Sequence, residues 1–173
     1  VRASKEADII SNCGDDALKF NGYGKASAEW MPSKALWLKR NEPENYKKAD
    51  KVCEYTDWMM YKLTGIWTGN DCNMSVRWYY NGPEGGFPVS LYKKIGLGDV
   101  LEKFPKDIKH IGDKISTLTS ESAEFLGLNK STIVGQGGID AYIGNIGLGV
   151  VRPGRIALIT GSSHLIMGFT DKP

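Results

Sequence analysis

The sequence predicts an α/β protein, and three observations support that fold class. Apolar residues recur at helical spacing in segments that begin near Ser, Thr, Asp or Pro, and several of these segments end at Gly. The β-branched run TIVG, at 132–135, is typical of a strand and precedes a further helical segment. Near the end of the sequence, two apolar runs flank the small-residue turn TGSS, which indicates a hairpin. Strands that alternate with helices are typical of α/β architecture.

The first third of the sequence is predicted to be mostly helical. Residues 1–20 have apolar or small side chains at helical spacing with a break at Gly14, so one helix and a shorter one are expected around it. Pro32 and Pro43 suit the first turns of the helices that contain SKALWLKR and ENYKKA. The segment DKVCEY, at 50–55, is expected to be a short strand.

The remaining elements alternate between helices, loops and strands. TDWMMYKLTG, at 56–65, is predicted to be a helix that Thr or Asp caps and Gly65 ends. The following stretch, 66–88, is rich in Gly, Asn and aromatic residues and is expected to be loop or short strands. Further elements are a short helix over 89–97, a capped helix over 119–128, a buried strand over 131–137, a helix from Asp140 and a hairpin within 152–169.

The composition excludes several classes of partner. The 173 residues are 41% hydrophobic and 24% charged, and 22 basic against 20 acidic residues leave a net charge of +2. Neither a nucleic acid nor an anionic membrane is expected as partner, because both would favour a clustered excess of Lys and Arg. The apolar runs are far shorter than the roughly 20 residues that span a bilayer, and no signal peptide is recognisable. A cytoplasmic protein is therefore expected.

The cysteines and histidines suggest no metal or hydrolytic site. Cys13, Cys53 and Cys72 are odd in number and have no C-x-x-C spacing, which predicts reduced thiols. His110 lies in the polar stretch IKHIGDK and is expected to be solvated. His164 follows a serine, but no G-x-S-x-G motif is present, so hydrolase chemistry is not favoured.

Two features near the C-terminus are candidates for chemistry. Gly137 and Gly138 leave the backbone open before Asp140, at the start of a predicted helix whose dipole favours an ionised carboxylate. Asp140 is either the cap of this helix or a catalytic base, and an ionised base suits phosphoryl transfer. The turn 160–163 could present amides and hydroxyls to a phosphate, although turns of this composition also join strands without any such role.

Four collinear motifs resemble the FGGY carbohydrate kinases. The segment GQGGIDAYIGNIGLGVVRPGRIALITGSSH is similar to the family's G-x-x-D-A motif, V-x-x-P-G turn and G-T-S-like hairpin, although Ser162 stands where the family has Thr. The segments PSKALWLKRNEPENYKKADKV and TDWMMYKLTG also resemble the family. The segments SAEWMPSK, EYTDW and NDCNMSVRW are most similar to the ribulokinase branch, although Pro32 lies one residue earlier than in that branch.

The resemblance implies an α/β fold that is part of an actin-like, ribonuclease-H-like pair of ATPase domains. It implies a central fragment, since neither the family's D-x-G-T phosphate loop nor its Gly-rich adenosine segment is present. Residues 1–152 would be the C-terminal part of the N-terminal, sugar-binding domain. Residues 153–173 would be the first strands of the C-terminal, nucleotide-binding domain, and the isolated fragment is expected to be inactive.

The resemblance also implies site residues and cosubstrates. The fragment would come from a kinase that uses ATP and Mg²⁺ to phosphorylate a ketopentose such as ribulose or xylulose, a small-molecule sugar. The expected roles are catalytic base for Asp140, sugar binding for Lys34, Trp30, Glu29 and Gly138, and phosphate binding for Thr160, Gly161, Ser162 and Ser163. Without the resemblance, Lys34 would be interpreted as a solvated helix lysine and Trp30 as a core aromatic residue.

Two alternatives remain open at this point. A non-catalytic sugar-binding or assembly module could keep the fold without the chemistry, because folds do not dictate function. A plain structural domain with Asp140 as helix cap is the other alternative. The sequence names neither the sugar nor the oligomeric state, and a homodimer of the full-length protein is left open.

Overall fold

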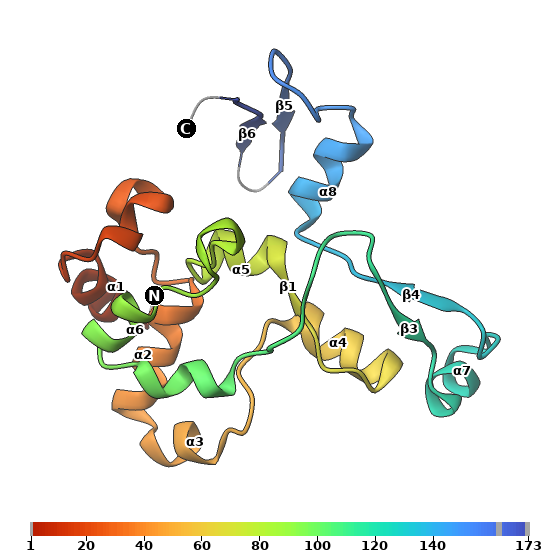
Figure 1. Cartoon of the computed structure of the whole chain (residues 1–173), viewed down its shortest axis with the longest axis horizontal. Coiled ribbons are helices and arrows are strands. Elements are labelled where there is room, and N and C mark those ends of the chain that lie inside the picture. Colours follow the sequence, from red (N-terminus) through yellow and green to blue (C-terminus); the bar gives the residue numbers. More distant parts are fainter. Residues whose placement is uncertain (1, 162–163, 172–173) are drawn as a thin grey trace. The chain divides into compact units, whose positions relative to one another are not determined.

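The computed structural model describes residues 2–161 and 164–171, and these form two compact units. The first unit extends to Gln136 and the second begins at Gly137 (Figure 1). Both contain helices and short strands, as the predicted α/β class requires. The predicted domain boundary after residue 152 concerns domains of a longer protein and stays a prediction.

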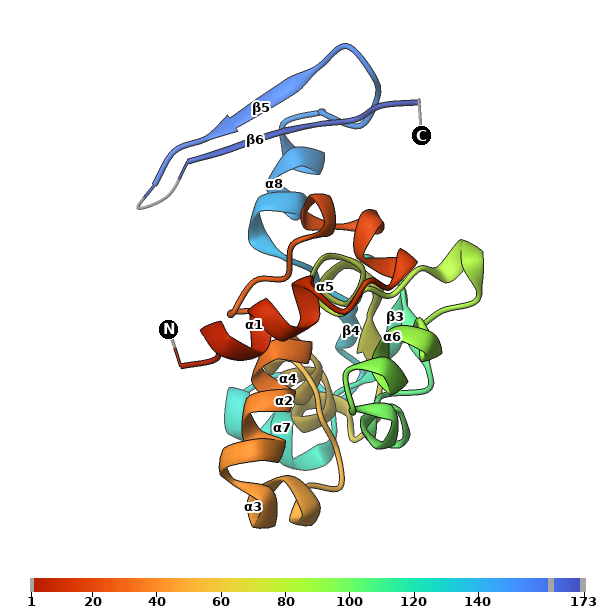
Figure 2. The same ribbon diagram turned by 90° about the vertical axis from the view of Figure 1, so that its left-hand side faces the viewer.

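The first unit begins with helices that confirm the predicted pattern. Helix α1 and a short 3₁₀ helix lie on either side of Gly14, whose φ of 67° only glycine adopts without strain. Pro32 and Pro43 lie in the first turns of α2 and α3. Helix α1 lies beside α2 (Figure 2). The bounds are α1 Ser4–Ser11, η1 Asp16–Phe20, η2 Gly22–Gly24, α2 Met31–Asn41 and α3 Pro43–Lys48.

Of two predictions for the middle of this unit, one is wrong and the other is wrong in part. Residues 51–54 form no strand, because the backbone hydrogen bond from Val52 to Lys103 is a single bond and not a ladder. The stretch 66–88, expected to be loop or short strands, contains the short strand β1 but also a helix, α5. The Asn70 side chain caps α5 by accepting from the Asn73 N–H. The elements here are α4 Tyr55–Thr64, β1 Gly69–Asn70, α5 Asp71–Arg77, η3 Gly82–Glu84, α6 Val89–Lys94, η4 Gly98–Lys103 and β2 Ile108–Lys109.

The end of the first unit is a small antiparallel ladder with a helix between its strands. Strand β3 (Lys114–Thr117) pairs with β4 (Ile133–Gly135), and α7 (Ser120–Leu126) connects them. Helix α7 begins after Thr119 and ends before Gly127, within the predicted range. The strand predicted over 131–137 is confirmed over its central residues, but it is buried only in part. Val134 is buried whereas Ile133 is 63% exposed, because this two-stranded ladder is covered on one face.

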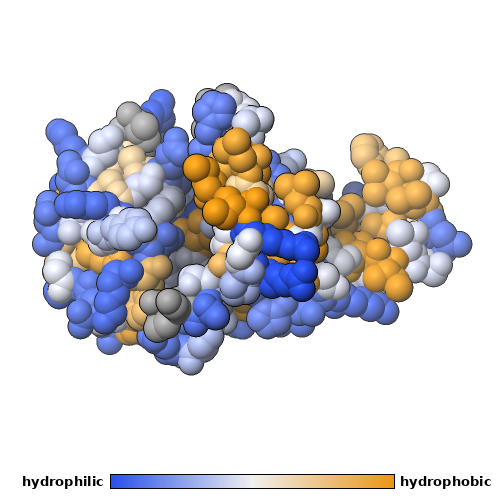
Figure 3. Space-filling model, turned by 90° about the horizontal axis from the view of Figure 1, so that it is seen from above, coloured by the Kyte–Doolittle hydropathy of each residue, from blue (hydrophilic) through white to orange (hydrophobic). Residues whose placement is uncertain are grey.

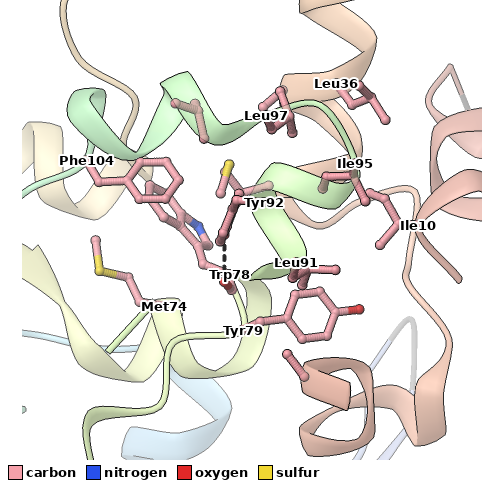
Figure 4. Packing of buried hydrophobic residues seen from close by; sticks show 14 of the residues in the cluster. Ile10, Leu36, Met74, Trp78, Tyr79, Leu91, Tyr92, Ile95, Leu97 and Phe104 are labelled. Atoms are coloured by element: carbon pink, nitrogen blue, oxygen red, sulfur yellow. Dashed lines mark hydrogen bonds between the residues drawn. The ribbon is translucent and has the colours of Figure 1, made fainter. Parts of the chain in front are cut away.

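The core of the first unit is built from aromatic side chains. Trp78, which follows α5, packs against Phe104 with their ring centroids 4.7 Å apart, and Phe87 lies 4.8 Å from Phe104. Figure 4 shows Tyr92 beside Trp78 and Phe104, and the Tyr92 hydroxyl donates to the Trp78 carbonyl at 2.7 Å. Because α2, α5, α6 and η4 all contribute to this cluster, it fixes their packing.

Helix α4 begins with a fully buried carboxylate. Its cap is Glu54 and not Thr or Asp as predicted, while Asp57 lies three residues on and accepts from the Glu54 N–H at 3.1 Å. Burial, together with the charge of Glu54, raises the pKa of Asp57 to about 7, although hydrogen bonds from the N–H groups of Glu54 and Asn70 oppose the shift. The Asp57 carboxyl group therefore loses its proton near neutral pH, well above the usual range of an Asp side chain.

We expect Asp57 to make the first unit less stable as pH rises. The folded pKa of about 7 lies above the roughly 3.9 of an unfolded Asp, so between these values the folded state binds more protons. The free energy of unfolding should then fall by at most about 1.4 kcal/mol per pH unit from pH 4 to 7 and stay level above pH 7.

The measurement is urea unfolding at half-unit steps from pH 4.5 to 8. Asp57→Asn removes the titrating group but keeps an oxygen for the Glu54 N–H, so its unfolding free energy should fall less across this range. Asp50→Asn is the control, since the Asp50 side chain is 89% exposed. If the unfolding free energies of Asp57→Asn and the unaltered protein changed in parallel with pH, the raised pKa of Asp57 would be contradicted.

The described residues of the second unit, 137–161 and 164–171, form one helix and one hairpin. Helix α8 covers Asp140–Gly147, as predicted from Asp140 onward. Strand β5 (Ile156–Ile159) pairs antiparallel with β6 (Leu165–Gly168), which confirms the predicted hairpin. Much of its apolar surface is exposed, and Figure 3 shows hydrophobic residues gathered there.

Candidate functional site

Asp140 is the first residue of α8 and not its cap. The residue before it, Ile139, has the extended φ and ψ of −64° and 131° and caps the helix without a side-chain hydrogen bond. The Asp140 carboxylate is exposed, and its Oδ1 atom accepts from the adjacent Ala141 N–H at 2.7 Å. The interpretation of Asp140 as a capping residue is therefore wrong, although its charge still lies in the first turn, where the helix dipole favours it.

Asp140 shares a pocket with part of the predicted phosphate turn. The pocket has a volume of about 420 Å³ and lies within the second unit. Asp140, Ala141 and Gly144 of α8 line one side, and Thr160 and Gly161, which follow β5, line another. A carboxylate and a turn with hydroxyl and amide donors thus meet at one cavity. This volume lies within the roughly 300–1,000 Å³ that is typical of small-molecule pockets.

The remaining predicted residues of this region are only partly described. Ser162 and Ser163 lie outside the described residues. Gly138 is half-buried, directly before Ile139. A Cβ atom built on Gly137 would meet no heavy atom within 4 Å, so the chain is open before α8.

Lys34 lines a second pocket, in the first unit. Its exposed side chain projects from the first half of α2 into a cavity of about 290 Å³. Asn45 of α3 and Glu54, the cap of α4, line the same cavity. This pocket therefore brings a cation, a carboxylate and an amide together from three separate elements.

Trp30 and Glu29 do not line the pocket that holds Lys34. The Trp30 ring is half-buried and meets Tyr79 edge-on, with ring centroids 5.5 Å apart and an interplanar angle of 77°. Glu29 is exposed, and its N–H donates to the Ser27 hydroxyl at 3.2 Å. Their sugar-binding roles stay predictions, and the packing of Trp30 on the core is what the alternative interpretation expects.

The thiols and carboxylates provide no metal centre among residues 2–161 and 164–171. Cys13, Cys53 and Cys72 form no disulfide in this part of the chain. No group of three or more His, Cys, Asp or Glu side chains in this part of the chain could hold a metal ion. His110 is exposed, as predicted, and pairs with Asp71, which raises its pKa. In the same part of the chain, no helix is long and apolar enough to cross a membrane.

Comparison with known proteins identifies relatives over the whole chain. Residues 2–147 match the sequence profile of the N-terminal domain of the FGGY family of carbohydrate kinases. A ribulokinase of Shouchella clausii is 33% identical over 178 residues, which cover 98% of this chain and 32% of the relative. An FGGY carbohydrate kinase domain-containing protein of Xenopus laevis is 32% identical, covering 99% of this chain and 34% of the relative. The chain thus spans about a third of the length of these curated relatives.

Solved structures show the same fold. A ligand-bound xylulose kinase from Lactobacillus acidophilus superposes with a TM-score of 0.83 at 22% identity, over 99% of this chain and 34% of that one. A glycerol kinase of Plasmodium falciparum with ADP gives 0.79 at 15% identity, over 96% of this chain and 33% of that one. The predicted fold class, an α/β part of an actin-like ATPase, is confirmed.

Glu54 and Asn45 were not predicted as site residues from the sequence. Both lie inside motifs that carried the resemblance, EYTDW and EPENY. No local pattern distinguishes them from exposed polar residues, because only the packing of α2, α3 and residues 52–54 places them beside Lys34. The one sequence signal that could have indicated them is that they lie inside these two motifs.

Proposed function

The chain belongs to the FGGY family of carbohydrate kinases, and from this we propose that the protein that contains it phosphorylates a sugar with ATP. The proposed acceptor is a hydroxyl of a ketopentose such as ribulose or xylulose. The names of the relatives support this choice, since they include ribulokinases and xylulose kinases. The observation that carries the proposal is the pocket that Asp140 shares with Thr160 and Gly161.

In the proposed reaction, Asp140 acts as general base. The sugar hydroxyl oxygen forms a bond to the γ-phosphorus of ATP while the bond from that phosphorus to its bridging oxygen breaks and ADP leaves. The hydroxyl proton passes to the Asp140 carboxylate, which is exposed to the pocket. Thr160 and Gly161 would donate hydrogen bonds to phosphate oxygens, and Ser162 and Ser163 are proposed for the same role.

The remaining site roles are proposed as the sequence predicts them. Lys34 would donate hydrogen bonds to sugar hydroxyls, and Gly138, Trp30 and Glu29 would lie around the sugar. Mg²⁺ usually binds through one or two carboxylates and the substrate's own phosphates, so it needs no dedicated cluster of protein ligands. Asp140, which lines the pocket with the predicted phosphate turn, is kept as the base, and no metal ligand is assigned among the predicted site residues.

The proposal extends to the organisation of the whole protein. Residues 1–152 would belong to its sugar-binding domain and 153–173 to its nucleotide-binding domain, in a cytoplasmic enzyme. The 173 residues alone should be inactive, because phosphoryl transfer needs both phosphate-binding parts and the metal.

A substrate panel tests this function on the full-length protein. ATP-dependent phosphorylation is measured with ribulose, xylulose, ribitol and glycerol, and we expect activity with at least one of the two ketopentoses.

Calorimetry tests the alternative of a non-catalytic sugar-binding module. We expect ATP to change the dissociation constant of the sugar about 5- to 150-fold, the usual range of coupling between two sites. Sugar binding that ATP leaves unchanged, without phosphorylation, would favour the module.

A further inference from the structure

The pocket beside Lys34 has a carboxylate that is already fixed in place. The Glu54 Oε1 atom accepts from the indole N–H of Trp78 at 2.8 Å. Trp78 is fully buried in the aromatic core, so this donor is fixed in position. The Glu54 backbone is also held, because its N–H donates to Asp57. Glu54 thus presents an ordered acceptor to the pocket, and little conformational entropy is lost when a ligand binds to it.

The other polar groups of the pocket complement this carboxylate. Lys34 forms no ion pair within residues 2–161 and 164–171, so its ammonium group is available as a donor. Asn45 is exposed, and its Nδ2 atom donates to Glu42, which leaves its amide oxygen facing solvent or a ligand. One positive and one negative side chain line the cavity beside this amide.

This set of groups selects a neutral, hydroxyl-rich ligand. An anion would be repelled by Glu54 and a cation by Lys34, whereas a hydroxyl both donates and accepts a hydrogen bond. The apolar side chains of Met31, Ala35 and Val52 also line the pocket and can pack against the C–H groups of such a ligand. The volume of about 290 Å³ is just below the roughly 300–1,000 Å³ that is typical of ligand pockets, which suits a small polyol.

The Cys53 thiol in the same pocket does not disturb this arrangement. Burial, together with the negative charges of Asp57 and Glu54, raises its pKa to about 11. The thiol therefore stays neutral at physiological pH and adds no second anion next to Glu54.

We propose that the pocket between α2, α3 and Glu54 binds the polyol chain of the sugar, with Glu54 as a specificity-determining residue that accepts hydrogen bonds from its hydroxyls. This inference rests on the proposed function for the identity of the ligand as the kinase's sugar. It assigns Glu54 and Asn45 to sugar binding together with Lys34. Trp78 is a positioning residue that acts through Glu54.

The test is calorimetric titration of the full-length protein with ribulose, xylulose and ribitol in the absence of nucleotide. Glu54→Gln keeps an oxygen for the Trp78 N–H but removes the charge. We expect it to raise the dissociation constant about 10- to 100-fold, the usual effect of one hydrogen bond to a charged group. Glu124→Gln is the matched control, because Glu124 is an exposed carboxylate of α7 outside this pocket, and it should leave the constant within twofold.

A second variant keeps the inference testable if Glu54→Gln folds poorly. Ala49 lines the pocket and follows α3, and its backbone φ and ψ of −64° and 116° suit a larger residue. Ala49→Leu should fill the cavity and abolish sugar binding, while the polar groups remain. A folded Ala49→Leu protein, or a folded Glu54→Gln protein, that binds the sugars as the unaltered protein does would overturn the inference.

The experiment separates this inference from the proposed function. Phosphorylation with an unchanged KM in Glu54→Gln would overturn the pocket assignment and leave the kinase intact. Sugar binding that depends on Glu54 in a protein without kinase activity would overturn the kinase and leave the pocket assigned. A raised KM with a nearly unchanged kcat supports both, since Glu54 would bind the sugar equally in the ground and transition states.

Discussion

Replacing Asp140 with Asn in the full-length protein should lower kcat for sugar phosphorylation by a factor of about 10²–10⁴, the usual value of a positioned general base. Asn has nearly the same shape as Asp but cannot accept the hydroxyl proton. Because Asp140 opens α8 without capping it by a side-chain bond to a later turn, the change should leave the fold intact. Steady-state kinetics with ribulose or xylulose, at saturating ATP and Mg²⁺, measures the effect.

The pattern of kinetic changes distinguishes a base from a binding group. If Asp140 only bound the sugar, Asp140→Asn would raise KM and leave kcat nearly unchanged. Asp171→Asn, an exposed carboxylate in the same unit, is the control and should change neither constant. Near-full activity of Asp140→Asn would remove this residue from the mechanism.

Helix ends were predictable from sequence where a local signal determines them. Helix α4 ends where Gly65 adopts a φ of 72°, and α7 is closed by Thr119 at its start and Gly127 at its end. These residues act on the neighbouring turn alone, so their effect can be read from the sequence without knowledge of the fold. The hairpin of the second unit was also predictable from a local pattern, two apolar runs that flank a turn of small residues.

The errors concern segments whose state depends on distant partners. Residues 51–54 have strand composition but form no strand, because the backbone bond from Val52 to Lys103 is isolated and starts no ladder. Strand β3 was not predicted, since its partner β4 lies beyond an intervening helix. Helix α5 lies in a stretch rich in Asn and Gly, where its Asn70 cap cannot be told from a turn residue.

The residues of the candidate site also fall into two groups, those that a local motif indicates and those that only tertiary packing brings together. Asp140 and Thr160 were singled out by motifs, and the structure places both on one pocket. Glu54 and Asn45 were not, because their place beside Lys34 arises from the packing of three separate elements. The buried state of Asp57 was equally unpredictable, since an acid in the first turn of a helix is usually solvated.

Truncating Trp78 to Ala should destabilise the protein by about 3–5 kcal/mol, the usual cost of removing a large aromatic side chain from a core. Trp78 has no exposed surface and packs against Phe104 and Phe87. The change also leaves the Glu54 Oε1 atom without its indole donor. Urea unfolding followed by near-ultraviolet circular dichroism measures the loss.

Two further variants separate packing from hydrogen bonding at this position. Trp78→Phe keeps most of the ring contact and loses the N–H, so it should cost about 1.5–3 kcal/mol, as expected for a hydrogen bond to a charged group. Trp58→Ala is the control, because Trp58 is 44% exposed and should contribute less. If Trp78 also positions Glu54, Trp78→Phe should weaken sugar binding while the protein stays folded. A Trp78→Ala protein as stable as Trp58→Ala would mean that the aromatic cluster does not hold the first unit together.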